Sequence, residues 1–342
     1  MSIASHAERG SRNRNRARRG AAGFTMFEVV VTTGILTIMV VIVQATIDGA
    51  SRAERRLRAT QIATARGERV TYELLGAVNG SRVLLAGAMG DAYLDAVEFG
   101  ARPPLTGARL PRIDQLNPLE PDVPGDPYTG NVMLFASESD AVEVVADAAT
   151  GSTRHIDLYR IVCVYPTQTT RKLLPDPPVQ PARDLVVWRS VRYANRTQLE
   201  AIEDDDERRS VVADLVNRHG CEFAWDVGAD FASAFFAMDI LGTLATNASS
   251  TMSLEEDPDA SQGGRLLYAD VQLARTLAGD FHRRARLSND DPATWVPDGF
   301  EVKITGLSGS RKVWMHLVVE SPGGKGIVGV QSNTVIAHPR DL

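Results

Sequence analysis

The chain has 342 residues, of which 44% are hydrophobic and 23% charged, so it can bury a core as one large domain or two smaller ones. Six arginines and one glutamate give residues 1–23 a net charge of +5, whereas the remaining residues carry −11. An acidic body argues against nucleic-acid binding, because contacts to phosphates need a basic surface.

The first predicted element is an apolar helix over residues 24–47, in which Glu28 is the only charged residue. Such a helix would be about 36 Å long, enough to cross a hydrocarbon core of about 30 Å. The arginines before it predict an amino terminus in the cytoplasm and a body on the far side of the membrane. Glu28 needs an explanation, because a carboxylate in lipid costs about 2.5–3.5 kcal/mol on insertion scales.

Other targeting segments fit residues 1–47 less well. A cleaved secretory signal has a shorter apolar core, followed by a cleavage site of small residues. A twin-arginine signal, suggested by Arg18-Arg19, meets the same objections. A plain signal anchor agrees with the length and charge but leaves Glu28 unexplained.

The run Gly23-Phe24-Thr25-Met26-Phe27-Glu28 resembles the prepilin signature of type IV pilin-like proteins, in which a basic leader ends in Gly before a Phe. A Glu then stands fifth in the mature chain, as Glu28 does when Phe24 is counted as the first residue. The resemblance implies cleavage after Gly23 by a membrane prepilin peptidase and N-methylation of Phe24. It also implies that Glu28 pairs with the terminal ammonium of a neighbouring subunit. The chain departs from the family at Thr37 and Ala45, where Gly and Pro are frequent.

Beyond Ile47 the chain becomes charged but keeps a helical composition. Residues 48–75 are rich in Ala, Arg, Glu and Leu and contain no proline, which predicts one continuous helix over residues 24–75. The alternative is two helices hinged at Asp48-Gly49. The second half is expected to be amphipathic and to pack against a globular head.

Residues 76–342 are predicted to form a β-rich head with long loop insertions, so the expected fold class is α+β. Proline-rich loops are expected at 102–127 and 175–181, a solvated acidic turn at Glu203–Glu207, and a short helix at Val211–Arg218. Runs of β-branched and aromatic residues predict strands at Val132–Ala136, Ala141–Ala146, His155–Tyr165, Leu185–Tyr193, Cys221–Trp225, Phe235–Ile240, Leu266–Leu273, Phe300–Ile304, Val313–Glu320 and Ile327–Ile336.

The two cysteines, Cys163 and Cys221, exclude a multi-cysteine metal site. In an exported head they are expected to form a disulfide, and the alternative is two buried thiols.

No catalytic, metal or cofactor site is predicted. The sequence has no nucleophile elbow, phosphate loop, metalloprotease helix or dinucleotide fingerprint, and its six histidines lack metal-ligand spacing. The acidic runs Glu203–Glu207 and Glu255–Asp259 lack the spacing and central Gly of a calcium loop.

With the resemblance, these features predict a non-enzymatic minor pilin or pseudopilin that initiates or caps a type IV pilus or a type II secretion pseudopilus. A head of 267 residues suits a tip better than a shaft, and the nearest likenesses are large PilW-type minor pilins and J-type pseudopilins. The expected partners are other pilins or pseudopilins, the prepilin peptidase, the inner-membrane assembly platform and membrane lipid. The expected location is the inner membrane, with the head in the periplasm, and then the fibre. Two alternatives are a membrane-anchored extracytoplasmic ligand-binding or adhesion protein and a single-pass enzyme with an unrecognised site.

Overall fold

The computed structural model divides into two compact units, with the boundary between Ala53 and Glu54. The second unit, Glu54–Leu342, is called the β domain below. The structure describes residues 24–97, 99–100, 102–115, 128–147, 149–168, 183–225, 235–238, 244–245, 265–266, 271–273, 299–307, 309–324 and 327–340. The predicted loop at 175–181, the acidic run Glu255–Asp259 and the leader at 1–23 lie outside these ranges.

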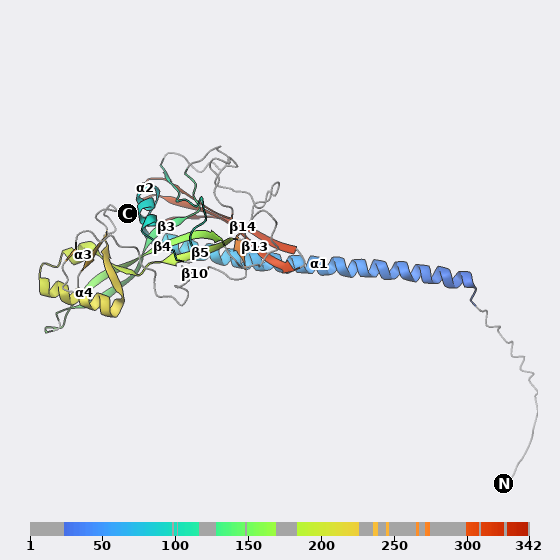
Figure 1. Ribbon diagram of the computed structural model, residues 1–342, viewed down its shortest axis with the longest axis horizontal. Coiled ribbons are helices and arrows are strands. Elements are labelled where there is room, and N and C mark those ends of the chain that lie inside the picture. The colour runs from blue at the N-terminus through green and yellow to red at the C-terminus, as the bar shows by residue number, and fades with distance from the viewer. Residues whose placement is uncertain are drawn as a thin grey trace, which may run out of the picture. The chain divides into compact units, whose positions relative to one another are not determined.

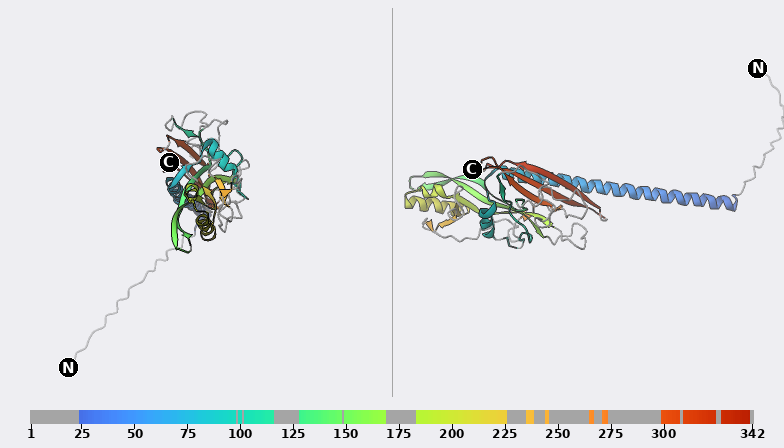
Figure 2. Two further views of the ribbon diagram at one scale, coloured as in Figure 1. Left: turned by 90° about the vertical axis from the view of Figure 1, so that its left-hand side faces the viewer. Right: turned by 90° about the horizontal axis from the view of Figure 1, so that it is seen from above.

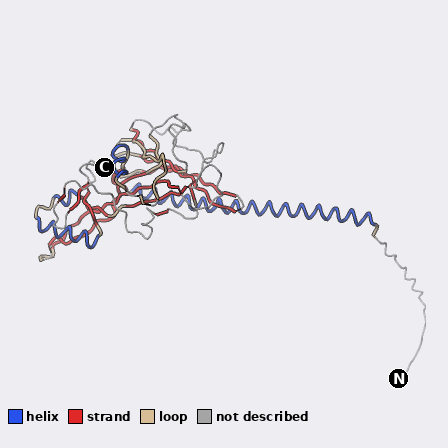
Figure 3. Tube along the Cα trace, in the orientation of Figure 1, coloured by secondary structure: helices blue, strands red, loops and turns tan. Residues whose placement is uncertain are grey.

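Helix α1 (Met26–Asn79) is continuous over 54 residues (Figures 1 and 3). The long amino-terminal helix is therefore confirmed, and Asp48-Gly49 lies within it rather than at a hinge. The helix ends four residues later than predicted, because Gly76 is accommodated in the last turn. The amide of Gly80 donates to the carbonyl of Gly76 at 3.1 Å, and strand β1 begins at Ser81.

The β domain is built on one curled, mainly antiparallel sheet, so the fold is α+β. Its path runs β2-β12-β13-β11-β5-β4-β6-β7-β8-β9; β3 pairs with β1 and β4, β10 with β5 and β14 with β13. The pairs β2–β12 and β6–β7 are parallel. The described strands are β1 (Ser81–Leu84), β2 (Ile113–Asp114), β3 (Met133–Asp147), β4 (Ser152–Gln168), β5 (Arg183–Arg189), β6 (Arg192–Asn195), β7 (Cys221–Trp225), β8 (Phe235–Met238), β9 (Leu244–Ala245), β10 (Arg265–Leu266), β11 (Gln272–Leu273), β12 (Phe300–Thr305), β13 (Lys312–Gly324) and β14 (Ile327–Ala337).

The central strands are buried on both faces. On β3, Met133 and Phe135 belong to a core cluster shared with α1, whereas Leu134 and Ala136 belong to a second cluster on the opposite face. The second cluster contains Trp188 and is covered in part by helix α2 (Gly87–Asp95). Successive side chains of a strand point to opposite faces, so two covered faces leave no polar alternation.

Helices α3 (Arg196–Glu200) and α4 (Asp205–His219) cover the far ends of β3 and β4 (Figure 1). The prediction of a solvated turn at Glu203–Glu207 is confirmed for exposure, since Glu203–Asp206 are exposed, but it is wrong for the turn, because most of the run belongs to α4. Asp204 caps α4, accepting a hydrogen bond from the amide of Glu207 at 2.8 Å, and the next three acids form its first turn. Carboxylates are favoured there because the amino-terminal end of a helix carries partial positive charge.

Within the β domain, the second half of α1 runs along β13 and β14 (Figure 2). Its buried residues recur every three or four positions, at Ala59, Ala63, Gly67, Val70, Thr71, Leu74 and Val78. A side chain on Gly329 of β14 would come within 2.2–2.4 Å of the backbone of Ala59 and Thr60. The helix and strand therefore approach closely enough that only glycine fits at position 329 without displacement.

Candidate functional site

The first half of α1 is the candidate functional element, because its apolar side chains are not buried by the chain. Every residue from Phe24 to Ala50 is exposed. Among the described residues, α1 is the one helix long and apolar enough to cross a membrane, judged by length and composition alone. The length and composition of the helix therefore support a membrane-anchoring role for its first half.

The threonines of this segment are satisfied within the helix. The hydroxyls of Thr32, Thr33, Thr37 and Thr46 each donate to the carbonyl four residues earlier, at 2.7–2.8 Å. In a lipid environment these groups need no outside partner, since unsatisfied polar groups there are costly. The segment can therefore meet hydrocarbon despite its threonines.

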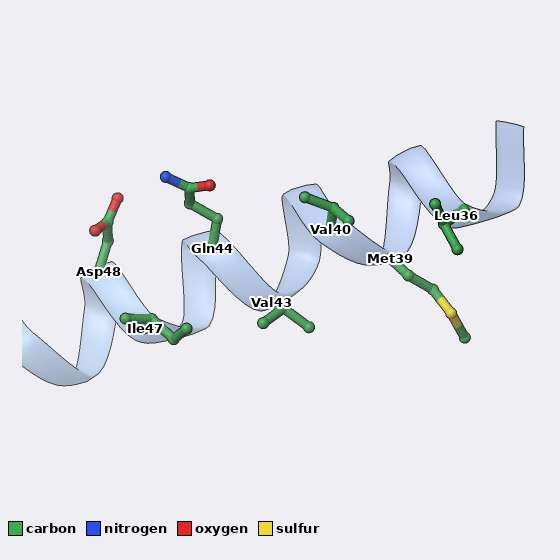
Figure 4. A pocket seen from close by; sticks show the side chains of 7 residues that line it. All are labelled: Leu36, Met39, Val40, Val43, Gln44, Ile47 and Asp48. Carbon is green, nitrogen blue, oxygen red and sulfur yellow. The ribbon is translucent and has the colours of Figure 1, made fainter. Parts of the chain in front are cut away.

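A shallow, mainly apolar surface lies near the end of the apolar run (Figure 4). Gln44 and Asp48 lie on one side of it, and Met39, Val43 and Ile47 point the other way. All its lining residues come from α1 itself, so this surface is a helix face, suited to lipid or another helix rather than to a small ligand.

Glu28 takes part in a hydrogen-bonded cap at the start of α1. Its Oε2 accepts from the amide of Thr25 at 2.9 Å and from the Thr25 hydroxyl at 3.0 Å, and its own amide donates to Thr25 Oγ1 at 3.3 Å. This is a reciprocal capping box, in which a Thr and the Glu three residues later satisfy each other's free amides. The Thr-x-x-Glu spacing is the sequence signal of this box. Glu28 therefore has a partner within its own chain in addition to the expected one in another subunit.

Of the predicted processing site, the structure describes Phe24 but not Gly23. Phe24 is 79% exposed at the start of the described chain, and Gly23 lies outside it. Cleavage at Gly23 and methylation of Phe24 therefore stay predictions.

Three side-chain hydrogen bonds tie the second half of α1 to β14 and the residue that follows it. Thr64 donates to Gln331 at 3.0 Å, Asn333 donates to Thr71 at 3.4 Å, and the amide of His338 donates to Asn79 at 2.8 Å. Together with the buried apolar residues, they make this half of α1 part of the β domain core.

The expected disulfide between Cys163 and Cys221 is not formed: both thiols are free and buried. Cys163 lies in β4 and Cys221 in β7, and β6 pairs between these strands. Strands two apart are separated by at least about 9–10 Å, and β6 meets β4 at Leu158 and Tyr159 rather than at Cys163. A disulfide needs Cα atoms within about 7 Å. The alternative of two buried thiols fits this geometry.

An acidic hollow lies where α4 begins. It is lined by Asp147, Asp204, Asp206 and Glu207, together with small residues. Glu207 pairs with Arg154 and Asp206 with Arg209, so these acids already have partners. In the described part of the chain, no group of three or more His, Cys, Asp or Glu residues is arranged to hold a metal ion.

Comparisons with protein families, with curated proteins and with solved structures find no match to this chain. Its function must therefore be inferred from α1 itself. This helix presents an exposed apolar half with a capped carboxylate near its start, and a second half buried in a β domain.

Proposed function

We propose that the protein is a minor pilin or pseudopilin of a type IV pilus or type II secretion system. It is held in the inner membrane by residues 24–47 before it enters a fibre. Its partners in this proposal are other pilins or pseudopilins, a prepilin peptidase that cleaves after Gly23, and the inner-membrane assembly platform. It performs no catalysis.

One observation carries the proposal: the Gly23-Phe24…Glu28 signature leads directly into a helix that continues to Asn79. A plain signal anchor needs only the apolar run. It does not require that the same helix continue as a main component of the globular core, where Val70, Leu74 and Val78 are 3% exposed or less. A subunit that exchanges lipid for neighbouring helices needs both parts, because the helix that enters the assembly must be joined to the folded domain.

The size of the β domain favours a position at a fibre tip. In a shaft, each domain must fit between neighbours above and below, whereas a tip subunit has none above it. The β domain contains 289 residues, including the second half of α1. We therefore place the protein at initiation or capping rather than in the shaft.

The mass of the mature amino terminus tests the proposal. In cells that contain the peptidase, mass spectrometry should find a chain beginning at Phe24 and about 14 Da heavier than the unmodified fragment if the terminus is methylated. A chain that retains Met1 in such cells would leave a plain membrane anchor as the better interpretation.

Substitutions at Thr25 and Glu28 separate two roles of the carboxylate. Glu28→Gln keeps an acceptor for the capping box but removes the charge, whereas Thr25→Ala removes the cap and keeps the charge. If Glu28 pairs with an ammonium in a neighbouring subunit, Glu28→Gln should reduce assembly at least about tenfold. The terminal ammonium would then lie in a low-dielectric environment without its counter-charge. Thr25→Ala should then assemble nearly as well as the parent.

The measurement is the amount of protein crosslinked to partner subunits in membranes, with peptidase processing as the control. Reduced assembly in Thr25→Ala alone would mean that Glu28 acts as a helix cap, and the pairing role would be wrong.

A further inference from the structure

The part of α1 that directly follows the apolar run is rich in arginine. Arg52, Arg55, Arg56 and Arg58 lie within seven residues, with Glu54 as the only acid among them. Arg52, Arg56 and Arg58 are exposed, and Arg55 is half-buried. The ion pairs of the described residues involve other arginines, among them Arg154, Arg196, Arg209 and Arg218. The cluster thus has a net positive charge, and among the described ion pairs none joins one of its arginines to a carboxylate.

This cluster lies at an unusual place for a membrane-anchored chain. Arginines are enriched beside a span on the cytoplasmic side, and here that side is already marked by the six arginines of residues 1–23. The cluster therefore lies on the flank where basic residues are normally fewer. Neighbouring like charges repel each other, so an anionic partner would stabilise them.

The geometry of a helix brings these side chains to the level of lipid headgroups. Arg55, Arg56 and Arg58 follow Ile47 by eight to eleven residues in the same helix, about 12–17 Å along its axis. Side chains on a helix slant toward its amino-terminal end, which here is the membrane end. The long arginine side chain can then reach back over the headgroup layer, about 5–8 Å thick on each side of the hydrocarbon.

We propose that Arg55, Arg56 and Arg58 bind the phosphate groups of anionic phospholipids in the leaflet next to the β domain. This rests on the proposed membrane span. The planar guanidinium donates two parallel hydrogen bonds to phosphate oxygens, and clusters of basic residues beside a span attract anionic lipid. Arg55 and Arg56 lie on the face of α1 that carries Ala59, which contacts Gly329. The bound lipids would therefore lie under the helix face that meets β14.

A fluorescent label beside the cluster can test this proposal on the full chain. Ala53→Cys places an exposed thiol next to the arginines, and both natural cysteines are buried. The labelled protein is reconstituted in vesicles containing equal small fractions of headgroup-nitroxide phosphatidylglycerol or phosphatidylcholine. Nitroxide quenching is short-ranged, about 10 Å, so it reports only the leaflet near position 53 and not the one near the leader, about 44 Å away along a helix.

We expect quenching by phosphatidylglycerol to exceed quenching by phosphatidylcholine about threefold, and 1 M salt to remove the difference. The triple variant Arg55→Gln, Arg56→Gln, Arg58→Gln should bring the ratio near one. The matched control Arg154→Gln, Arg209→Gln, Arg218→Gln makes the same change in net charge and should leave the ratio unchanged.

Equal quenching by the two lipids in the parent protein would overturn the lipid site. It would point instead to carboxylates of another subunit as the partners of the cluster. Failure of the span looks different, since neither lipid would quench and alkaline carbonate would release the protein from the vesicles.

Discussion

Cys163 and Cys221 show how burial sets the chemistry of single residues. Burial raises the pKa of the Cys221 thiol to about 12 and also raises that of Cys163. An unfolded chain ionises its thiols near pH 8.5. The folded state therefore holds more protons than the unfolded state above that pH, so stability is full below about pH 8.5 and falls as the pH rises.

We expect the free energy of unfolding to fall by about 2 kcal/mol per thiol between pH 8 and pH 10. Urea unfolding at several pH values measures the effect, and the double variant Cys163→Ala, Cys221→Ala should lose this part of the pH dependence. Thiol titration gives the second check: none should react in the native protein, and two should react in denaturant without reductant. Finding no reactive thiol in denaturant would mean that a disulfide forms after all.

At the scale of elements, the contact between α1 and β14 leaves no room for a side chain. In Gly329→Ala the new methyl group would meet backbone atoms of Ala59 and Thr60, which cannot turn away as a side chain can. We expect a loss of about 1–3 kcal/mol in the free energy of unfolding, the usual cost of overpacking.

Gly76→Ala is the matched control, because nothing lies within 4 Å of the added atom and the position is helical. It should stabilise the protein by about 0.5–1 kcal/mol through helix propensity. Urea unfolding of both variants in detergent measures the difference. Equal midpoints for Gly329→Ala and the parent would show that α1 does not approach β14 as described.

Most strands could be predicted, but their lengths and some boundaries could not. The separate predictions Val132–Ala136 and Ala141–Ala146 are one strand, β3, with a bulge between Glu138 and Asp140. Polar bulge residues look like a turn in a sequence, and only the pairing with β4 keeps them in the ladder. The opposite error occurred at Leu185–Tyr193, which is divided into β5 and β6.

The elements that were missed are those whose sequence signal is weak. Helix α2 contains two glycines, Gly87 and Gly90, and Asn195 at the start of α3 is a cap for only five residues. The acids at the start of α4 resemble a solvated turn because they are polar, although acidic residues are also typical of a first helical turn. Tertiary contacts, which local composition does not show, stabilise these short helices. Leu199 of α3 and Leu215 of α4, for example, are 2% exposed or less.

At the scale of the whole molecule, the candidate site was predictable where it depends on linear order. The apolar run, the position of Glu28 and the continuation into an amphipathic half follow from the sequence, because helical periodicity is local. The sheet that covers the second half was not predictable in its order. Strand β13 pairs with β11, and β11 pairs with β5, which lies more than a hundred residues before β12 and β13 in the sequence. The separation of Cys163 from Cys221 depends on the same order.

The membrane orientation of the chain depends on the arginines at the two ends of its apolar run. Six arginines precede the apolar run and four follow it closely, so the balance that holds the amino terminus in the cytoplasm is small. Replacing Arg14, Arg16, Arg18 and Arg19 by Gln leaves two against four. The fraction of chains with the β domain on the cytoplasmic side should then rise, because basic residues close to a span resist translocation.

Protease added to intact spheroplasts measures this fraction, since only an outward-facing β domain is cut. The control replaces Arg154, Arg208, Arg209 and Arg218 by Gln, which changes the net charge equally but far from the span, and it should keep the parental orientation. Further replacement of Arg55, Arg56 and Arg58 in the leader variant should restore the outward orientation, because the opposing charge is then removed. If the leader variant stays fully outward-facing, the leader charge does not orient the protein, and translocation of the acidic β domain itself must decide the topology.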